Sequence, residues 1–357
     1  QKFIDNNSDY LTECKKHNIY VQKHSQKHLA LIKYHPNKEY DFESHPWMRE
    51  CRGLIVNTAT NKVICVPPVK SIQKEMEWFL QDGFQSQDFE IYIEGTMMNV
   101  FFHEGTWYVS TRSSIGANNS WDGKMSFSKM FHETVPKDFY DSLQKDHCYS
   151  FVLIHKNNRI VSPTNGGNRV YLVEQHKVGE TGCERVQCEE LEGIYDTMHI
   201  TQDYLHNYQP ENLYFSIKGF MIKQGGERYS WINPNYEYAL SLKMNNNNKF
   251  MNYIELRQKG LLKEYFQYFP EDTIEFNEYR EIFNSIKQQL YDEYVSIFIR
   301  KEKSTKDIEY SLRPLIYELH KGYLETKEKI SFQKVSEYMH KLPCKKIVFI
   351  SNHMNLN

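Results

Sequence analysis

Hydrophobic and polar residues alternate over short stretches of the first two thirds of the chain, which is the pattern of β-strands. The clearest alternation lies between residues 96 and 111, on either side of the turn sequence His103-Glu104-Gly105-Thr106. Other strand patterns occupy residues 54–57, 63–66, 149–154, 169–173 and 215–232. Because Gly and Asn turns join them, rather than regular helices, the pattern predicts an antiparallel α+β domain of two sheets.

The pattern changes after the asparagine run at residues 245–248. Between Glu275 and Lys301 the apolar residues recur every three or four positions, which predicts a long helix with one apolar face. Shorter stretches at residues 308–323 and 331–340 repeat this spacing. An acidic, helix-like stretch at Gln187–Tyr208 predicts an outer helix of the strand-rich part. We therefore predict three parts: an N-terminal extension over 1–45, a strand-rich domain over 46–245 and an all-helical domain over 246–357.

Composition limits the class of protein further. A content of 40% hydrophobic and 15% aromatic residues indicates a folded chain. The formal net charge of -2 gives no overall basic field, so any contact with nucleic acid must come from local basic patches. No apolar run approaches the ~18 residues of a membrane span, and we expect no membrane partner.

The seven cysteines are odd in number and widely spread, without a Cys-x-x-Cys motif. This usage is typical of reduced thiols in an intracellular protein. The pair Cys183 and Cys188, separated by four residues, leaves a metal site there as an alternative. We expect no metal ion at the predicted functional site.

One short motif precedes the hairpin over residues 96–111. The sequence Tyr92-Ile93-Glu94-Gly95-Thr96 leads into its first strand, and Arg112 follows its second. This arrangement resembles the Lys-x-Asp-Gly motif of nucleotidyltransferases of the ligase and capping-enzyme superfamily, with its basic residue downstream. In that superfamily the lysine amine attacks the α-phosphate of ATP. Here Tyr92 takes that place, and a phenol with a pKa near ~10 is almost wholly protonated at neutral pH.

A second group of motifs resembles the RNA ligase 1 family of T-even phages. Arg52-Gly53 enters an apolar strand, a hairpin follows, and residues 67–73 then include Lys70. The resemblance implies an ATP-grasp-like ligase fold of the nucleotidyltransferase type. It further implies that Arg52 approaches the bound nucleotide and Lys70 its phosphates, through charge-assisted hydrogen bonds.

Later motifs of the family are matched in position and not in chemistry. Val152 replaces a strand glutamate, although Asn158–Val161 keeps the turn that follows it. Lys218-Gly219 replaces a Glu-Gly pair, and Ser230 and Ile232 replace two lysines. The residues that the resemblance implies in nucleotide or phosphate binding are Arg52, Lys70, Glu94, Gly95, Arg112, Lys223 and Arg228.

The lost groups supply the nucleophile, the metal-side acids and the phosphate clamps of phosphoryl transfer. We interpret the chain as a ligase-fold pseudoenzyme that needs no cofactor and serves as an RNA-binding, structural or assembly component. RNA, another polyanion and proteins are its expected partners. The alternative is an active RNA ligase that uses ATP and Mg²⁺ and a displaced lysine, Lys70 or Lys74.

The amino-acid usage adds an expectation about source. The chain is rich in Asn, Lys, Ile, Tyr and Phe. This usage fits an AT-rich viral genome, and we therefore expect an intracellular location, in the cytoplasm of a host cell or in a virion.

Overall fold

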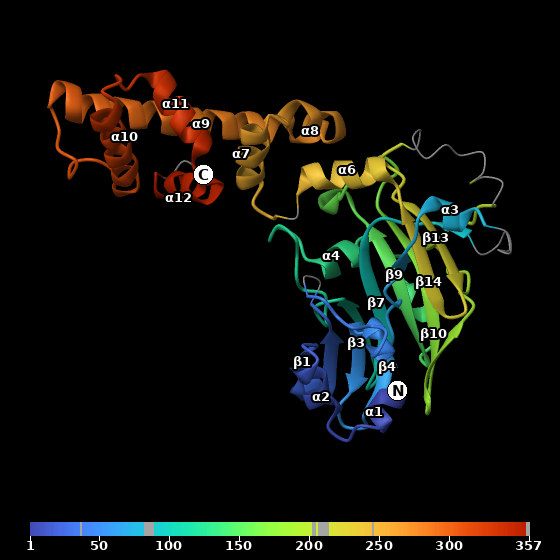
Figure 1. Ribbon diagram of the computed structural model, residues 1–357. Helices are drawn as coiled ribbons and strands as arrows, with labels where there is room; N and C mark the ends of the chain where they lie inside the picture. The colour runs from blue at the N-terminus through green and yellow to red at the C-terminus, as the bar shows by residue number, and fades with distance from the viewer. Residues whose placement is uncertain (36–37, 82–88, 202–204, 206–213, 245, 355–357) are drawn as a thin grey trace. The chain divides into compact units, whose positions relative to one another are not determined.

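The computed structural model describes residues 1–35, 38–81, 89–201, 205, 214–244 and 246–354 (Figure 1). The chain divides into two compact units, Gln1–Tyr238 and Ala239–Asn357, which we describe separately. Residue 245, at which the sequence analysis ends the strand-rich domain, lies outside the described residues. The three-part division therefore stays a prediction.

The first sheet of the N-terminal unit contains four antiparallel strands in the order β1–β2–β3–β4. Their bounds are β1 Tyr20–His24, β2 Leu29–Lys33, β3 Arg52–Asn57 and β4 Lys62–Cys65. Two strands thus come from the predicted extension, which also forms the helices α1 Lys2–Asp5 and α2 Tyr10–Lys16. Ile4, Tyr10 and Cys14 of these helices pack against Ile32 and Leu54. The segment thus contributes side chains to the core of this unit.

The second sheet contains the predicted hairpin, in which Val100 of β7 lies opposite Val109 of β8. The strand order is β11–β10–β9–β7–β8, and β12 pairs with β10. Leu31 and Ile55 of the first sheet pack against Phe101 and Cys148 of this one. The helix α4 Phe127–His132 supplies further core residues. The strand bounds are β7 Thr96–His103, β8 Thr106–Thr111, β9 His147–Ile154, β10 Arg169–Gly179, β11 Gly182–Val186 and β12 Tyr195–Asp196.

The third sheet has the order β5–β14–β13–β6 and packs on α3 Met76–Phe79. The described strands therefore form three sheets and not the predicted two. The difference arises because β6 pairs with β13, far away in sequence, and not with β7, which directly follows it. The prevailing antiparallel pairing agrees with the prediction. The bounds are β5 Ile72–Gln73, β6 Phe89–Ile91, β13 Gly219–Gln224 and β14 Glu227–Ile232.

The outer helix predicted over Gln187–Tyr208 is not formed over residues 187–201, whereas Leu205 is helical. Residues 187–201 form a loop that contains β12, which pairs in parallel with β10. Residues 202–204 and 206–208 lie outside the described residues.

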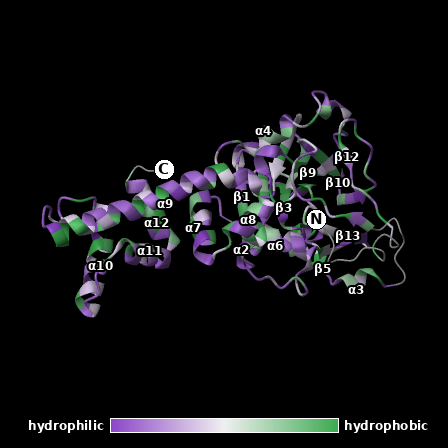
Figure 2. Cartoon of the chain, turned by 90° about the horizontal axis from the view of Figure 1, so that it is seen from above, coloured by the Kyte–Doolittle hydropathy of each residue, from purple (hydrophilic) through white to green (hydrophobic). Residues whose placement is uncertain are grey.

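The C-terminal unit is helical in its described part, as predicted. The expected helix over 275–301 is present as α9 Thr273–Tyr294, continued by a π-helical segment Val295–Arg300. The buried side chains of α9 include Phe276, Phe283, Ile286 and Leu290, and Figure 2 shows hydrophobic and hydrophilic positions mixed along its ribbon. The remaining helices are α6 Pro234–Lys243, which crosses the boundary of the units, α7 Lys249–Lys259, α8 Leu262–Tyr268, α10 Arg313–Thr326, α11 Phe332–Lys341 and α12 Cys344–His353.

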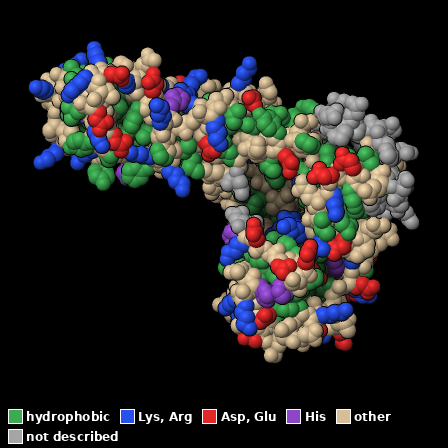
Figure 3. Space-filling model, viewed as in Figure 1, with side chains coloured by type: hydrophobic (Ala, Val, Ile, Leu, Met, Phe, Trp, Pro, Cys, Tyr) green, Lys and Arg blue, Asp and Glu red, His purple; other side chains and the backbone are tan. Residues whose placement is uncertain are grey.

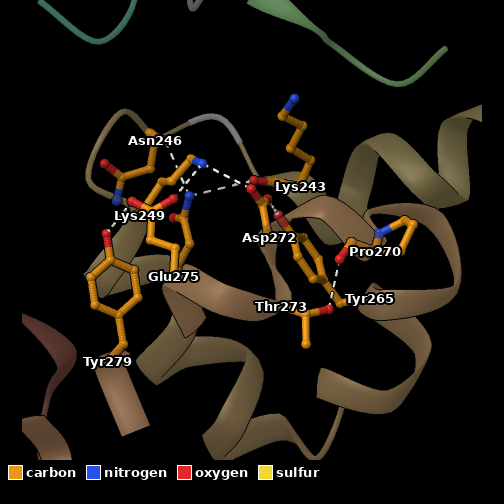
Figure 4. Close-up of polar contacts among 10 residues, drawn as sticks. Lys243, Asn246, Lys249, Tyr265, Pro270, Asp272, Thr273, Glu275 and Tyr279 are labelled. Carbon is orange, nitrogen blue, oxygen red and sulfur yellow. Dashed lines mark hydrogen bonds and ion pairs between the residues drawn. The ribbon is translucent and has the colours of Figure 1, made fainter. Parts of the chain in front are cut away.

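A network of polar contacts joins the first residue of α7 to the start of α9 (Figure 4). The ammonium of Lys249 lies 2.8 Å from Asp272 Oδ1 and 2.7 Å from Glu275 Oε2. The hydroxyl of Tyr265 donates to Asp272 at 2.5 Å, and that of Tyr279 donates to Glu275 at 2.6 Å. Both carboxylates stand at the N-terminal end of α9, where the helix dipole favours negative charge.

Charged side chains of both signs are interspersed over the visible face of the C-terminal unit, with hydrophobic side chains between them (Figure 3). Among the described helices, none combines the length and the apolar character that a membrane crossing requires. All seven cysteines are free thiols.

Candidate anion-binding cavity

A cavity of about 80 Å³ in the N-terminal unit collects most of the motifs found in the sequence. It is lined by the start of β3, the segment between β6 and β7, the residue after β8, and parts of β9, β13 and β14. The lining residues singled out in the sequence are Arg52, Tyr92, Gly95, Arg112, Val152, Lys218 and Arg228.

Two glycines allow these segments to approach one another closely. A β-carbon on Gly53, whose φ is +104°, would lie 2.8 Å from the Cα atom of Arg112. A β-carbon on Gly95 would lie 2.5 Å from the carbonyl oxygen of Leu153 in β9. Both distances are shorter than any side chain tolerates, so glycine is required at each position. The Arg-Gly and Glu-Gly pairs thus bring their segments to the edge of the cavity.

The cavity is strongly cationic. Four of its lining side chains are Arg52, Arg112, Lys218 and Arg228, whereas Glu90 is the single carboxylate among the described lining residues. Glu90 is already paired, since its Oε2 lies 2.8 Å from the ammonium of Lys223. Within the described part of the chain, neither Arg52 nor Arg112 forms an ion pair with a carboxylate. An anion that enters would therefore meet uncompensated positive charge.

Arg228 is the most enclosed of the four cations. Its side chain on β14 is 7% exposed, and its terminal Nη2 donates to Met221 Sδ at 3.0 Å. Its Nε has no hydrogen-bond partner. Burial lowers the pKa of Arg228, and the neighbouring Glu174 carboxylate opposes this effect, so the guanidinium is charged at pH 7. A buried charged donor without a partner is costly, which makes an anionic oxygen a favourable occupant.

Arg112 and Lys218 reach the same space from other elements. Arg112 is exposed, and partial desolvation by its surroundings and the neighbouring Arg52 lower its pKa, which still leaves it positively charged at pH 7. The ammonium of Lys218 lies 3.6 Å from the centre of the Tyr92 ring. Burial lowers the pKa of Lys218, and Tyr92 acts in the opposite direction. Cations from separate strands therefore converge on one tyrosine.

Tyr92 is fixed beside these cations by its backbone, whose N–H donates to the Gly219 carbonyl at 2.9 Å. Burial alone would raise the pKa of Tyr92, but Lys218, Arg228 and Arg112 lower it to about 8. At pH 7 about a tenth of the Tyr92 side chains are then phenolate. The phenol is still mostly protonated at pH 7, and the neighbouring charges, which residue type alone does not include, place its pKa below the ordinary value near ~10.

This ionisation can be observed directly. In ligand-free protein we expect the absorbance difference between wild type and Tyr92→Phe to show one tyrosinate titration near pH 8. Lys218→Met should move it to higher pH, because the nearest cation is lost. Buried tyrosines elsewhere, such as Tyr149 with its pKa raised to about 12, titrate later. A difference spectrum that titrates at pH 10 or above would contradict the assignment.

The carboxylate of Glu94 has a different set of partners. Its two oxygens accept the backbone N–H groups of Val161 at 2.9 Å and Ser162 at 2.8 Å. Nearby, the Asn158 amide donates to Thr96 Oγ1 at 2.9 Å. The Glu-Gly motif is thereby tied to the turn at Asn158–Val161, which the sequence analysis had found separately. Gly95 lines the cavity and Glu94 does not, so a contact between Glu94 and a nucleotide stays a prediction.

Three predicted lysines also lie outside the cavity lining. The ammonium of Lys70 lies 5.0 Å from the centre of the Phe42 ring, and that of Lys74 lies 5.6 Å from the Trp78 ring. Lys223 contacts Glu90 and donates to the Val173 carbonyl at 2.9 Å. These positions do not bring Lys70, Lys74 or Lys223 into contact with a ligand in the described cavity, and any such contact stays a prediction.

Lys218 is the cavity cation that the sequence analysis did not identify. The sequence shows it only as a lysine in the place of a glutamate, and its position beside Tyr92 depends on residues distant in sequence. A signal was nevertheless present: Lys218-Gly219 repeats the pattern of Arg52-Gly53 and Glu94-Gly95, a charged residue before a glycine.

The expectation of no metal ion at this site stays a prediction. Val152, at the position where the resemblance implies a strand glutamate, lines the cavity. Among the described residues, no group of three or more His, Cys, Asp or Glu side chains is placed to hold a metal ion.

Comparison with known proteins gives one match in sequence. No protein-family model matches the chain. It is 26% identical over 172 residues to a protein described as a bifunctional polynucleotide kinase/RNA ligase of Autographa californica nuclear polyhedrosis virus. The match covers 42% of this chain and 24% of that protein, so it spans about a quarter of the relative's length. The similarity agrees with the resemblance to RNA ligases, while the assignment to the T-even phage family stays a prediction.

Two solved structures show a distant likeness. One is described as an ATP-dependent DNA ligase from Aquifex aeolicus, with a TM-score of 0.41 and 13% identity over 82% of this chain and 78% of that one. The other is an archaeal ATP-dependent RNA ligase, with a TM-score of 0.44 and 10% identity over 76% of this chain and 75% of that one.

Proposed function

We propose that the N-terminal unit is an RNA-ligase-type domain that binds the phosphate groups of an RNA end or a nucleotide in the cationic cavity. The observation that carries this proposal is the buried guanidinium of Arg228, whose Nε lacks a partner. Arg52, Arg112 and Lys218 line the same space. Phosphate oxygens are suitable acceptors for guanidinium and ammonium donors. RNA is the favoured class of ligand because the sequence relative is described as an RNA ligase.

The same proposal holds that no lysyl-adenylate forms at the motif position, because that position carries Tyr92. This binding role needs no resident cofactor, and it suits a structural or assembly component in a host cell or a virion. The alternative is an active ATP-dependent RNA ligase with a displaced lysine. It is favoured by the relative's description, and its predicted candidates are Lys70 and Lys74, which both lie outside the cavity lining.

The test compares ligands that differ in one phosphate. Calorimetric titration should show that a short RNA with a 5′-phosphate binds the full chain at least about tenfold more tightly than the same RNA with a 5′-hydroxyl, the worth of one charge-assisted contact. Pyrophosphate should compete with the phosphorylated RNA. The preference should weaken as ionic strength rises.

The matched control is Lys137→Met, which removes an exposed cation of the same unit outside the cavity. It should leave the preference intact. Equal binding of both RNAs, without competition by pyrophosphate, would overturn the proposal.

A further inference from the structure

We infer that Tyr92 is a nucleophile, and that the cavity transfers the nucleotidyl group of a nucleoside triphosphate to its phenolic oxygen. This inference rests on the proposed phosphate binding and goes beyond it. It replaces the lysine chemistry of related enzymes with an oxygen ester on a different side chain. The product is an O-nucleotidyl-tyrosine on the protein itself.

The geometry places Tyr92 at the point where an α-phosphate would meet the cations. The residue lines the cavity, and the hydrogen bond from its N–H to Gly219 fixes its backbone against β13. The ammonium of Lys218 lies 3.6 Å from the centre of its ring. Arg112 and Arg228 act on it electrostatically from the end of β8 and from β14. A cavity of about 80 Å³ holds one phosphate-sized group, so the rest of the nucleotide would lie outside it.

The same cations serve both partners of the reaction. They favour the phenolate form of Tyr92, which is the form that attacks. They also neutralise the charge that develops on the departing pyrophosphate. A half-buried tyrosine among cations thus provides the two functions that the missing lysines provide in related enzymes.

The step balances without any further reactant. The phenol proton passes to water, and the phenolate oxygen forms a bond to the α-phosphorus. The bond between the α-phosphorus and the oxygen bridging to the β-phosphate breaks, and pyrophosphate leaves with that electron pair. The new link is an aryl phosphodiester. It resists mild acid, whereas the phosphorus–nitrogen bond of a lysyl adduct is cleaved once its nitrogen is protonated.

The experiment incubates the full chain with each of the four ribonucleoside triphosphates, α-labelled, in a buffer containing Mg²⁺, and separates the protein under denaturing conditions. We expect a label that survives mild acid and that mass spectrometry places on Tyr92. Tyr92→Phe keeps the aromatic ring beside Lys218 and removes the phenolic oxygen. Labelling of this variant should therefore fall to background. Its affinity for pyrophosphate should stay within about twofold of wild type. Tyr20→Phe, an exposed tyrosine of the same unit, should label as wild type.

The pH dependence gives a second readout. Initial labelling rates should rise about tenfold between pH 7 and pH 9, as expected for a phenolate that forms near pH 8. Each other outcome is decisive. An acid-labile label on Lys218, or no label on a protein that binds pyrophosphate, overturns the inference and leaves phosphate binding standing. A protein that binds neither pyrophosphate nor phosphorylated RNA overturns the proposed function as well.

Discussion

Replacing Arg228 with Met should weaken pyrophosphate binding about 10- to 100-fold, which corresponds to the worth of one or two charge-assisted hydrogen bonds. The guanidinium is buried on β14 and offers an unpartnered Nε, so a bound phosphate satisfies a donor that is otherwise unpaired. Methionine keeps much of the length and apolar volume of the side chain and removes every donor. Arg228→Lys should recover part of the affinity, since it restores the charge without the planar fork.

The measurement is a calorimetric titration at fixed ionic strength, because exposed charges contribute more at low salt. Arg185→Met is the matched control, since Arg185 is an exposed arginine on β11 outside the cavity lining. A thermal melt of each variant separates lost binding from lost folding. An equal loss in both variants, or none in Arg228→Met, would contradict the assignment of Arg228 as a phosphate contact.

The central hairpin could be predicted from sequence because two apolar stretches of strand length flank a turn that contains Gly105. Strand β7 is buried on both faces from Met97 to Phe101. The long helix α9 was equally clear, since a stripe of large apolar residues at helical spacing spans several turns. Local periodicity is therefore enough wherever an element is long and amphipathic.

The third sheet could not be predicted by the same means. Strand β5 has two residues and β6 has three, which is too short to show a period. Their partners are distant in sequence, as in the pairing of Ile72 with Tyr229. The opposite error occurred at residues 187–201, where an acidic loop has the spacing of a helix without forming one. Short strands depend on long-range pairing, which a single sequence does not display.

The site was predicted in its residues better than in its electrostatics. The resemblance to the ligase family pointed to Arg52, Arg112 and Arg228, and these three line one cavity. Spacing could not show that Lys223 is paired with Glu90, nor that Lys218 lies against Tyr92. The ionisation of a side chain depends on charges from strands distant in sequence, and the identity of the residue gives only its starting value.

Breaking the ion pair between Glu90 and Lys223 should cost the N-terminal unit about 3–5 kcal/mol of unfolding free energy, as for other buried pairs that lose one member. The two side chains are 10% and 9% exposed, and the ammonium also donates to the Val173 carbonyl. Lys223→Met would leave the Glu90 carboxylate buried without its cation. The double variant Glu90→Met/Lys223→Met should recover much of the loss, because no buried charge then remains.

The loss should depend on pH with opposite signs in the two single variants. In Lys223→Met the buried Glu90 carboxylate lacks its cation, and protonation removes this unfavourable charge, so the variant is least impaired at low pH. In Glu90→Gln the unpaired Lys223 has a folded pKa below its unfolded value, so that variant improves as pH rises. Urea titrations at pH 5, 7 and 9 measure both trends. Tryptophan fluorescence reports the N-terminal unit alone, since all five tryptophans lie in it.

The control is Lys259→Met, which breaks the exposed ion pair with Glu255 in the other unit. It should change the unfolding free energy of its own unit by less than about 1 kcal/mol. Circular dichroism of the helices measures this change. Losses of equal size in Lys223→Met and the double variant, without any dependence on pH, would show that the pair fills space and that its charges contribute nothing to stability.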